Sequence, residues 1–185
     1  MDAKRRTAIL GLAFLVLLVF SYVGNTVFFS IVGDLFANRS LANQFLAVVM
    51  LFVNNVLVVS LILFGMSFYV SLVISDFFKR EKYAYVVVDH PGIFALVFTI
   101  MIVILSILRV ANLIYGSIII EALPWILLVS APVGIVEGYG IYLTIKKTLS
   151  RTMSLKDLAY IYGIFFIAAL IEVGFVNLLI WVTKG

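Results

Sequence analysis

The chain contains no cysteine, a single histidine and three prolines, and charged residues make up only 12% of it. Without cysteine, the chain can form no disulfide, thiol nucleophile or thiolate metal site. Water-soluble domains carry about a quarter of their residues as charges, so this low charge content excludes a soluble globule.

Hydrophobic residues make up 65% of the 185 positions. A membrane helix needs about 20 mostly apolar residues, and four long stretches of low charge satisfy this length: 7–33, 40–75, 91–145 and 158–183. The third stretch would be about 80 Å long as one helix, so we expect it to fold back near Glu121 and Pro124. The predicted fold is therefore an all-α, polytopic transmembrane bundle forming a single domain over residues 1–185, with five spans at about 8–32, 50–75, 92–118, 123–145 and 158–182.

The basic residues predict the orientation of these spans. Ten of the thirteen lysines and arginines fall on one side of a five-span arrangement, which the positive-inside rule assigns to the cytoplasm. The N-terminus is then cytoplasmic and the C-terminus lies outside. The ten are Lys4, Arg5, Arg6, Lys79, Arg80, Lys82, Lys146, Lys147, Arg151 and Lys156.

Two segments leave alternatives open. The start of the chain resembles a signal peptide, but its apolar run continues to Val32 without a small-residue cleavage site, so we favour a retained first span. Residues 40–53 extend the second stretch beyond the length needed for one crossing. They are compatible with an interfacial segment, a shallow re-entrant segment, or one strongly tilted helix.

Polar residues inside the predicted spans form a candidate intramembrane cluster, because charges in hydrocarbon need a partner or a role. Glu137 precedes Lys146 by nine residues, so it lies about 13 Å above the cytoplasmic edge and is expected to be protonated and to donate a hydrogen bond. Arg109 and Glu172 lie about 22–26 Å above that edge, near Asn55. Arg109 is expected either to pair with Glu172 or to snorkel to the outer headgroups.

Small residues recur every four positions on two spans. Gly134 and Gly138 are four residues apart on the fourth span, and Ser67 and Ser71 are four residues apart on the second. Such ladders allow close helix packing, within this chain in the first place and between two copies in the second. Pro132 is expected to kink the fourth span.

The sequence contains no motif of a known catalytic or phosphate-binding site. The only histidine, His90, lies in a predicted cytoplasmic loop, and no HExxH, GxSxG or phosphate-binding loop is present. We expect no enzyme, no metal site, no cofactor and no nucleic-acid partner. The expected partners are the lipid bilayer and other membrane proteins or a second copy, at the cell membrane.

Three short motifs resemble the stage II sporulation protein M family. They are Phe52-Val-Asn54-Asn55 with a later Gly65, Pro132-Val-Gly134-Ile135-Val-Glu137, and Ala168-Ala-Leu-Ile-Glu172, in the family's order. Val133 departs from the pattern, because the family often has histidine there. The resemblance implies an integral membrane scaffold; the namesake is associated with anchoring cell-wall-degrading enzymes during engulfment in sporulating bacteria.

The functional expectation is a non-catalytic scaffold or accessory subunit of a membrane complex. The alternative is a small transporter or channel component in which Glu137 and Glu172 carry protons or cations.

Overall fold

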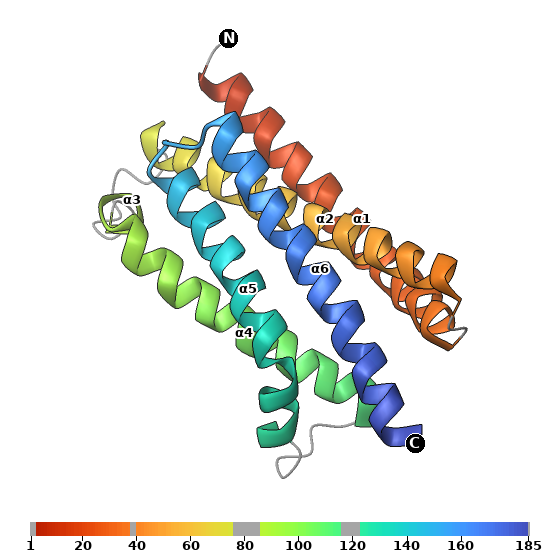
Figure 1. The fold of residues 1–185 in the computed structure, drawn as a ribbon. Coiled ribbons are helices and arrows are strands. Elements are labelled where there is room, and N and C mark those ends of the chain that lie inside the picture. Colours follow the sequence, from red (N-terminus) through yellow and green to blue (C-terminus); the bar gives the residue numbers. More distant parts are fainter. Residues whose placement is uncertain (1–2, 38–39, 76–85, 116–122, 185) are drawn as a thin grey trace.

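The computed structural model describes residues 3–37, 40–75, 86–115 and 123–184, and within them every regular element is a helix. Five helices are long and one is a single turn (Figure 1). Their bounds are α1 Ala3–Ala37, α2 Leu41–Ile74, α3 Val86–Asp89, α4 Pro91–Tyr115, α5 Leu123–Leu149 and α6 Leu155–Lys184. The predicted all-α class is confirmed.

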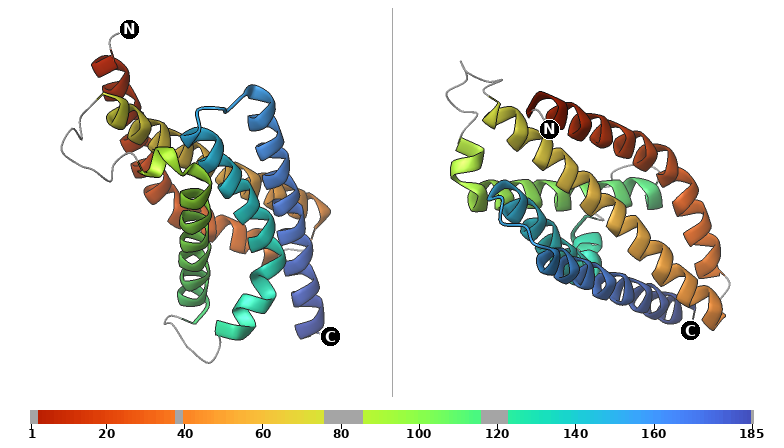
Figure 2. Two further views of the ribbon diagram at one scale, coloured as in Figure 1. Left: turned by 90° about the vertical axis from the view of Figure 1, so that its left-hand side faces the viewer. Right: turned by 90° about the horizontal axis from the view of Figure 1, so that it is seen from above.

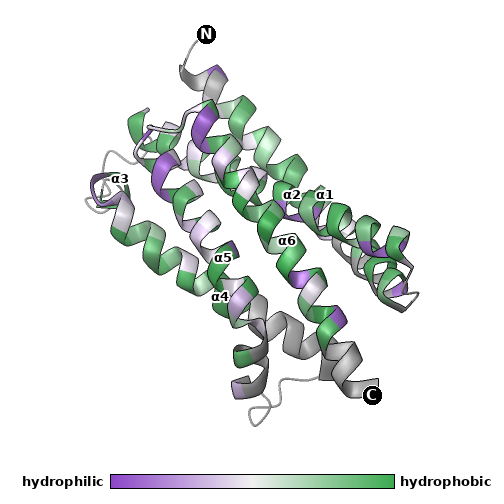
Figure 3. Ribbon diagram, viewed as in Figure 1, coloured by the Kyte–Doolittle hydropathy of each residue, from purple (hydrophilic) through white to green (hydrophobic). Residues whose placement is uncertain are grey.

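Three of the helices are long and apolar enough to cross a membrane within their described residues. Their apolar windows are Thr7–Gly24, Leu41–Ile74 and Leu155–Leu178, and α4 adds a shorter apolar stretch over Pro91–Leu105. Figure 3 shows hydrophobic residues along most of the coloured part of each long helix, with hydrophilic ones at the last turns of α5, at the first turns of α6, in the C-terminal half of α6 and where α1 and α2 meet at their far end. These surfaces are those of a membrane protein.

Local signals in the sequence mark where helices begin. The Ser40 hydroxyl accepts the N–H of Asn43 at 3.2 Å and caps the start of α2. Pro91 occupies the first position of α4, where its missing N–H costs nothing. The stretch from 91 to 145 does fold back, since α4 and α5 are separate helices packed against each other, while Glu121 itself lies outside the described residues.

Residues 41–53 belong to the continuous helix α2 and form no separate segment there. A helix of 34 residues is about 51 Å long, which is more than the roughly 30 Å of a bilayer's hydrocarbon core. Ala47, Val48 and Leu51 are buried in one core cluster with Val173 of α6. This burial packs the N-terminal part of α2 into the bundle.

Helix α2 is central, because it packs against α1, α5 and α6, while α4 packs against α5 (Figure 2). The contact between α1 and α2 is reciprocal. A Cβ atom on Gly11 would lie 2.8 Å from the Phe68 ring, and one on Gly65 would lie 2.8 Å from the Phe14 ring. Each glycine therefore accommodates an aromatic ring of the neighbouring helix.

The two ends of the bundle differ in charge. Figure 1 shows the N-terminal turn of α1, the last turns of α2 and α5, and the first turn of α6 at one end, with the C-terminus at the other. Arg5, Lys146, Lys147 and Lys156 lie on these helix turns, and Arg151 lies in the turn between α5 and α6.

Pro132 lies inside α5, where it has no N–H to donate to the preceding turn. Figure 1 shows the N-terminal part of α5 running at an angle to its straight C-terminal part. This bend lies in the half of the helix that contains the proline.

Candidate functional site

Polar residues from three helices lie near one another inside the bundle. The side-chain amide of Asn55, on α2, donates a hydrogen bond from Nδ2 to Oε1 of Glu137, on α5, at 3.0 Å. Asn55 is 9% exposed. A hydrogen bond between two helices in an apolar surrounding fixes their relative position, because neither group has a better partner in lipid.

Glu172 of α6 lies near this pair. Its carboxyl group is close enough to that of Glu137 for the two to interact electrostatically, and both side chains are half-buried. Among the described residues, neither carboxyl forms an ion pair; the one salt bridge there joins Lys147 to Asp157. We call Asn55, Glu137 and Glu172 the polar cluster.

The polar cluster differs from the grouping predicted from the positions of these residues in their spans. Counting residues from the cytoplasmic ends puts Asn55 near Glu172 and well above Glu137. The structure instead brings Asn55 into contact with Glu137, with the amide Nδ2 at 3.0 Å from Oε1. Arg109 belongs to α4, and its side chain lies outside the described residues, so its pairing with Glu172 stays a prediction.

The side of α5 that carries Gly134 and Gly138 packs against another helix of the same chain. A Cβ on Gly138 would lie 3.4 Å from Val103 and 3.7 Å from Thr99, and one on Gly134 would lie 3.9 Å from Val103. Val103 and Thr99 belong to α4. The Gly134 and Gly138 face therefore serves packing between α4 and α5 within the chain.

Sequence reasoning missed Gly140, which makes the closest approach in the bundle core. A Cβ at this position would lie 2.6 Å from Cε2 of Phe165, on α6. Gly138 and Gly140 are two residues apart and hence about 200° apart around the helix, so they face opposite neighbours. The Gly-Tyr-Gly spacing is the signal that could have indicated two packed faces.

Ser67 and Ser71 lie where α2 meets α1. The Ser71 and Thr7 hydroxyls are 2.6 Å apart and form a hydrogen bond between the two helices. Both serines also line a cavity of about 580 Å³ between α1, α2 and the α5–α6 turn. Ser71 therefore contributes to the packing of α1 against α2, and both serines contribute to the lining of this cavity.

A capping box holds the turn between α5 and α6. The backbone N–H of Ser154 donates to Oδ2 of Asp157 at 3.0 Å, and the backbone N–H of Asp157 donates to the Ser154 hydroxyl at 3.1 Å. Lys147 adds an ion pair with Asp157 at 3.2 Å. These contacts fix the geometry of the basic end of the bundle.

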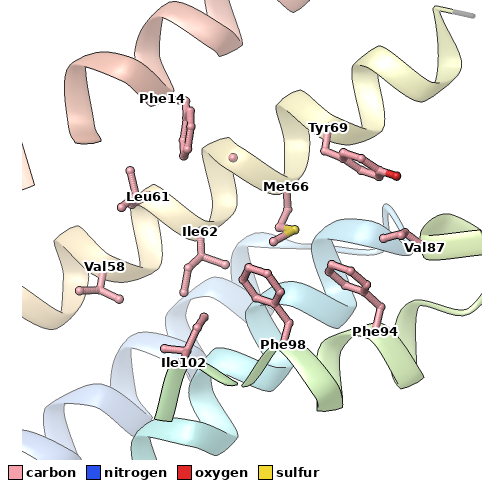
Figure 4. Close-up of a pocket in the computed structure, with 11 residues that line it drawn as sticks. Phe14, Val58, Leu61, Ile62, Met66, Tyr69, Val87, Phe94, Phe98 and Ile102 are labelled. Carbon is pink, nitrogen blue, oxygen red and sulfur yellow. The ribbon is translucent and has the colours of Figure 1, made fainter. Parts of the chain in front are cut away.

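A second cavity, of about 660 Å³, lies between α2 and α4 (Figure 4). Phe94 and Phe98 of α4 stack on each other at 5.3 Å between centroids and point toward Met66 of α2. Tyr69 provides the one hydroxyl among the side chains that line this cavity. The cavity suits hydrocarbon and not a polar ligand.

Comparison of the chain with protein-family models, with curated proteins and with solved structures finds no match. Within the described ranges, no group of three or more histidines, aspartates and glutamates is arranged to hold a metal ion. The resemblance to the stage II sporulation protein M family therefore stays a hypothesis carried by the three short motifs.

Proposed function

We propose that the protein is a five-span scaffold or accessory subunit of a complex in the cell membrane, with its N-terminus in the cytoplasm and its C-terminus outside. The five long helices are the spans of this proposal. It is supported by the basic residues that gather at one end of the bundle, since lysine and arginine are retained on the cytoplasmic side.

The observation that carries the scaffold role is the hydrogen bond between Asn55 and Glu137. Glu137 of α5 is used to join α5 to α2. Gly138 brings α5 close to α4, and Gly140 brings it close to α6. Polar groups used in this way rigidify a bundle, and a rigid membrane bundle is what a scaffold needs to offer partners a constant surface.

The family resemblance supports the same role. Its three motifs end in Asn55, Glu137 and Glu172, and these are the three residues of the polar cluster. Short motifs on three helices that meet in space describe one structural unit.

Reconstitution and purification together test this proposal. The purified protein in proteoliposomes should produce no proton or cation flux above protein-free vesicles, and Glu137→Gln should leave that baseline unchanged. From native membranes in mild detergent, the protein should co-purify with other membrane proteins in constant ratio. A chain that purifies alone under these conditions contradicts the scaffold role.

The electrostatic contact between Glu137 and Glu172 favours a second candidate, a small transporter or channel component. Two carboxyl groups close together inside a bilayer, without a basic partner among the described residues, are what a proton relay uses. Flux that is abolished both by Glu137→Gln and by Glu172→Gln would favour this candidate and would reject the scaffold.

A further inference from the structure

The cavity of about 580 Å³ at the basic end of the bundle has a mixed lining. Its apolar residues include Leu10 of α1 and Leu63 and Ile74 of α2. Its polar residues include Ser67 and Ser71, on the same face of α2 as Ile74, and Arg151 of the turn between α5 and α6. A molecule that fits must combine an apolar part with a polar part that a cation attracts.

Arg151 is the uncompensated charge of this cavity. Lys147, on the preceding turn, is paired with Asp157 at 3.2 Å. Arg151 is exposed and, in the part of the chain that the structure covers, has no ion-pair partner. A guanidinium in this position binds phosphate through two parallel hydrogen bonds, and Lys does so only as a point charge.

The backbone at Arg151 is in the left-handed region, with a φ of 57°. Its N–H donates to the Thr148 carbonyl at 3.1 Å, and the Thr152 N–H donates to the Lys147 carbonyl at 3.0 Å, which closes the C-terminal end of α5. Glycine adopts this conformation without strain. Replacing Arg151 by glycine therefore removes the side chain while favouring the backbone that the turn requires.

The cavity opens at the end of the bundle that the proposed topology places at the membrane surface. It lies beside the last turns of α2 and α5, at the end where the basic residues gather. In the proposed topology this end faces the cytoplasmic leaflet, whose anionic lipids attract basic residues.

We propose that this cavity binds an anionic phospholipid, with the phosphate on Arg151 at the end of the bundle and with the start of an acyl chain against Leu10 and Leu63, farther from that end. The apolar lining distinguishes a lipid from free phosphate, because phosphate has no apolar part to place against it. The proposal rests on the membrane embedding of the chain and not on its scaffold role.

Native mass spectrometry of the full chain in mixed micelles tests the assignment. We expect adducts of phosphatidylglycerol in preference to phosphatidylcholine, and millimolar inorganic phosphate should not displace them. Arg151→Gly should lower the preference about fivefold, the factor that one cation is worth near an anionic surface. The same variant should be at least as stable as the parent chain, so a loss of lipid cannot be ascribed to unfolding.

Lys156→Ala is the matched control. Lys156 is exposed at the same end of the bundle, carries the same charge and does not line the cavity. It should keep the full preference for phosphatidylglycerol. The proposal is overturned if Lys156→Ala lowers the preference as much as Arg151→Gly does, if Arg151→Gly leaves it unchanged, or if inorganic phosphate displaces the lipid. A chain that binds phosphatidylglycerol selectively and purifies without protein partners would reject the scaffold role and leave this proposal standing.

Discussion

The close approach of α5 and α6 at Gly140 allows a sharp test of the packing. In Gly140→Ala the new methyl carbon would lie 2.6 Å from Cε2 and 2.9 Å from Cζ of Phe165, well inside contact distance. Phe165 is 1% exposed and belongs to the main core cluster with Ile141 and Ile161, so its ring has no free space to move into. We therefore expect the helices to be forced apart.

Overpacking of this kind costs about 1–3 kcal/mol of the free energy of unfolding. Exchanging glycine for alanine inside a helix gains about 1 kcal/mol through backbone entropy, which offsets part of that cost. Gly163→Ala separates the two effects, because Gly163 is an exposed residue of α6 with nothing within 4 Å of its Cβ position. The two alanine variants should therefore differ by about 1–3 kcal/mol, the overpacking cost alone.

The assay is unfolding by SDS of the protein in mild detergent, followed by circular dichroism. Gly140→Ala should unfold at a lower SDS fraction than Gly163→Ala, and Phe165→Leu in the Gly140→Ala background should recover part of the difference. Equal transition midpoints for the two alanine variants would refute the close contact between α5 and α6.

Three further predictions concern the polar cluster, the turn and the topology. Asn55→Ala should destabilise the bundle by about 1 kcal/mol in the same SDS titration, because Glu137 loses its hydrogen-bond donor; an unchanged midpoint would show that the bond contributes nothing. Ser154→Ala removes the cap of α6 and should cost about 1 kcal/mol, seen as a lower SDS midpoint, and a Ser154→Asp variant should restore most of it. Because the chain has no cysteine, Lys82→Cys and Lys147→Cys can be labelled one at a time with an impermeant maleimide; both should react only from the cytoplasmic side, and reaction from opposite sides would reject the five-span topology.

Composition alone was enough to predict the class of this protein. A chain with 65% hydrophobic and 12% charged residues has no way to cover itself with polar surface, and in lipid the backbone must satisfy its own hydrogen bonds, which single chain segments do only as helices. The starts of three helices depend on local residues, because Ser40, Pro91 and Ser154 act on the adjacent turn and need no distant partner.

The partners of the buried residues depended on the tertiary structure. A helical repeat predicts that Gly138 faces some neighbour, but it does not say that this neighbour is α4, nor that Gly140 meets Phe165 on the opposite side. Position along the sequence likewise separated Asn55 from Glu137, and only the packing of α2 against α5 brings the two side chains to 3.0 Å. Periodicity and composition are properties of one segment, whereas the tilt and the order of helices follow from how all five fit together, and that fit determines which polar groups meet.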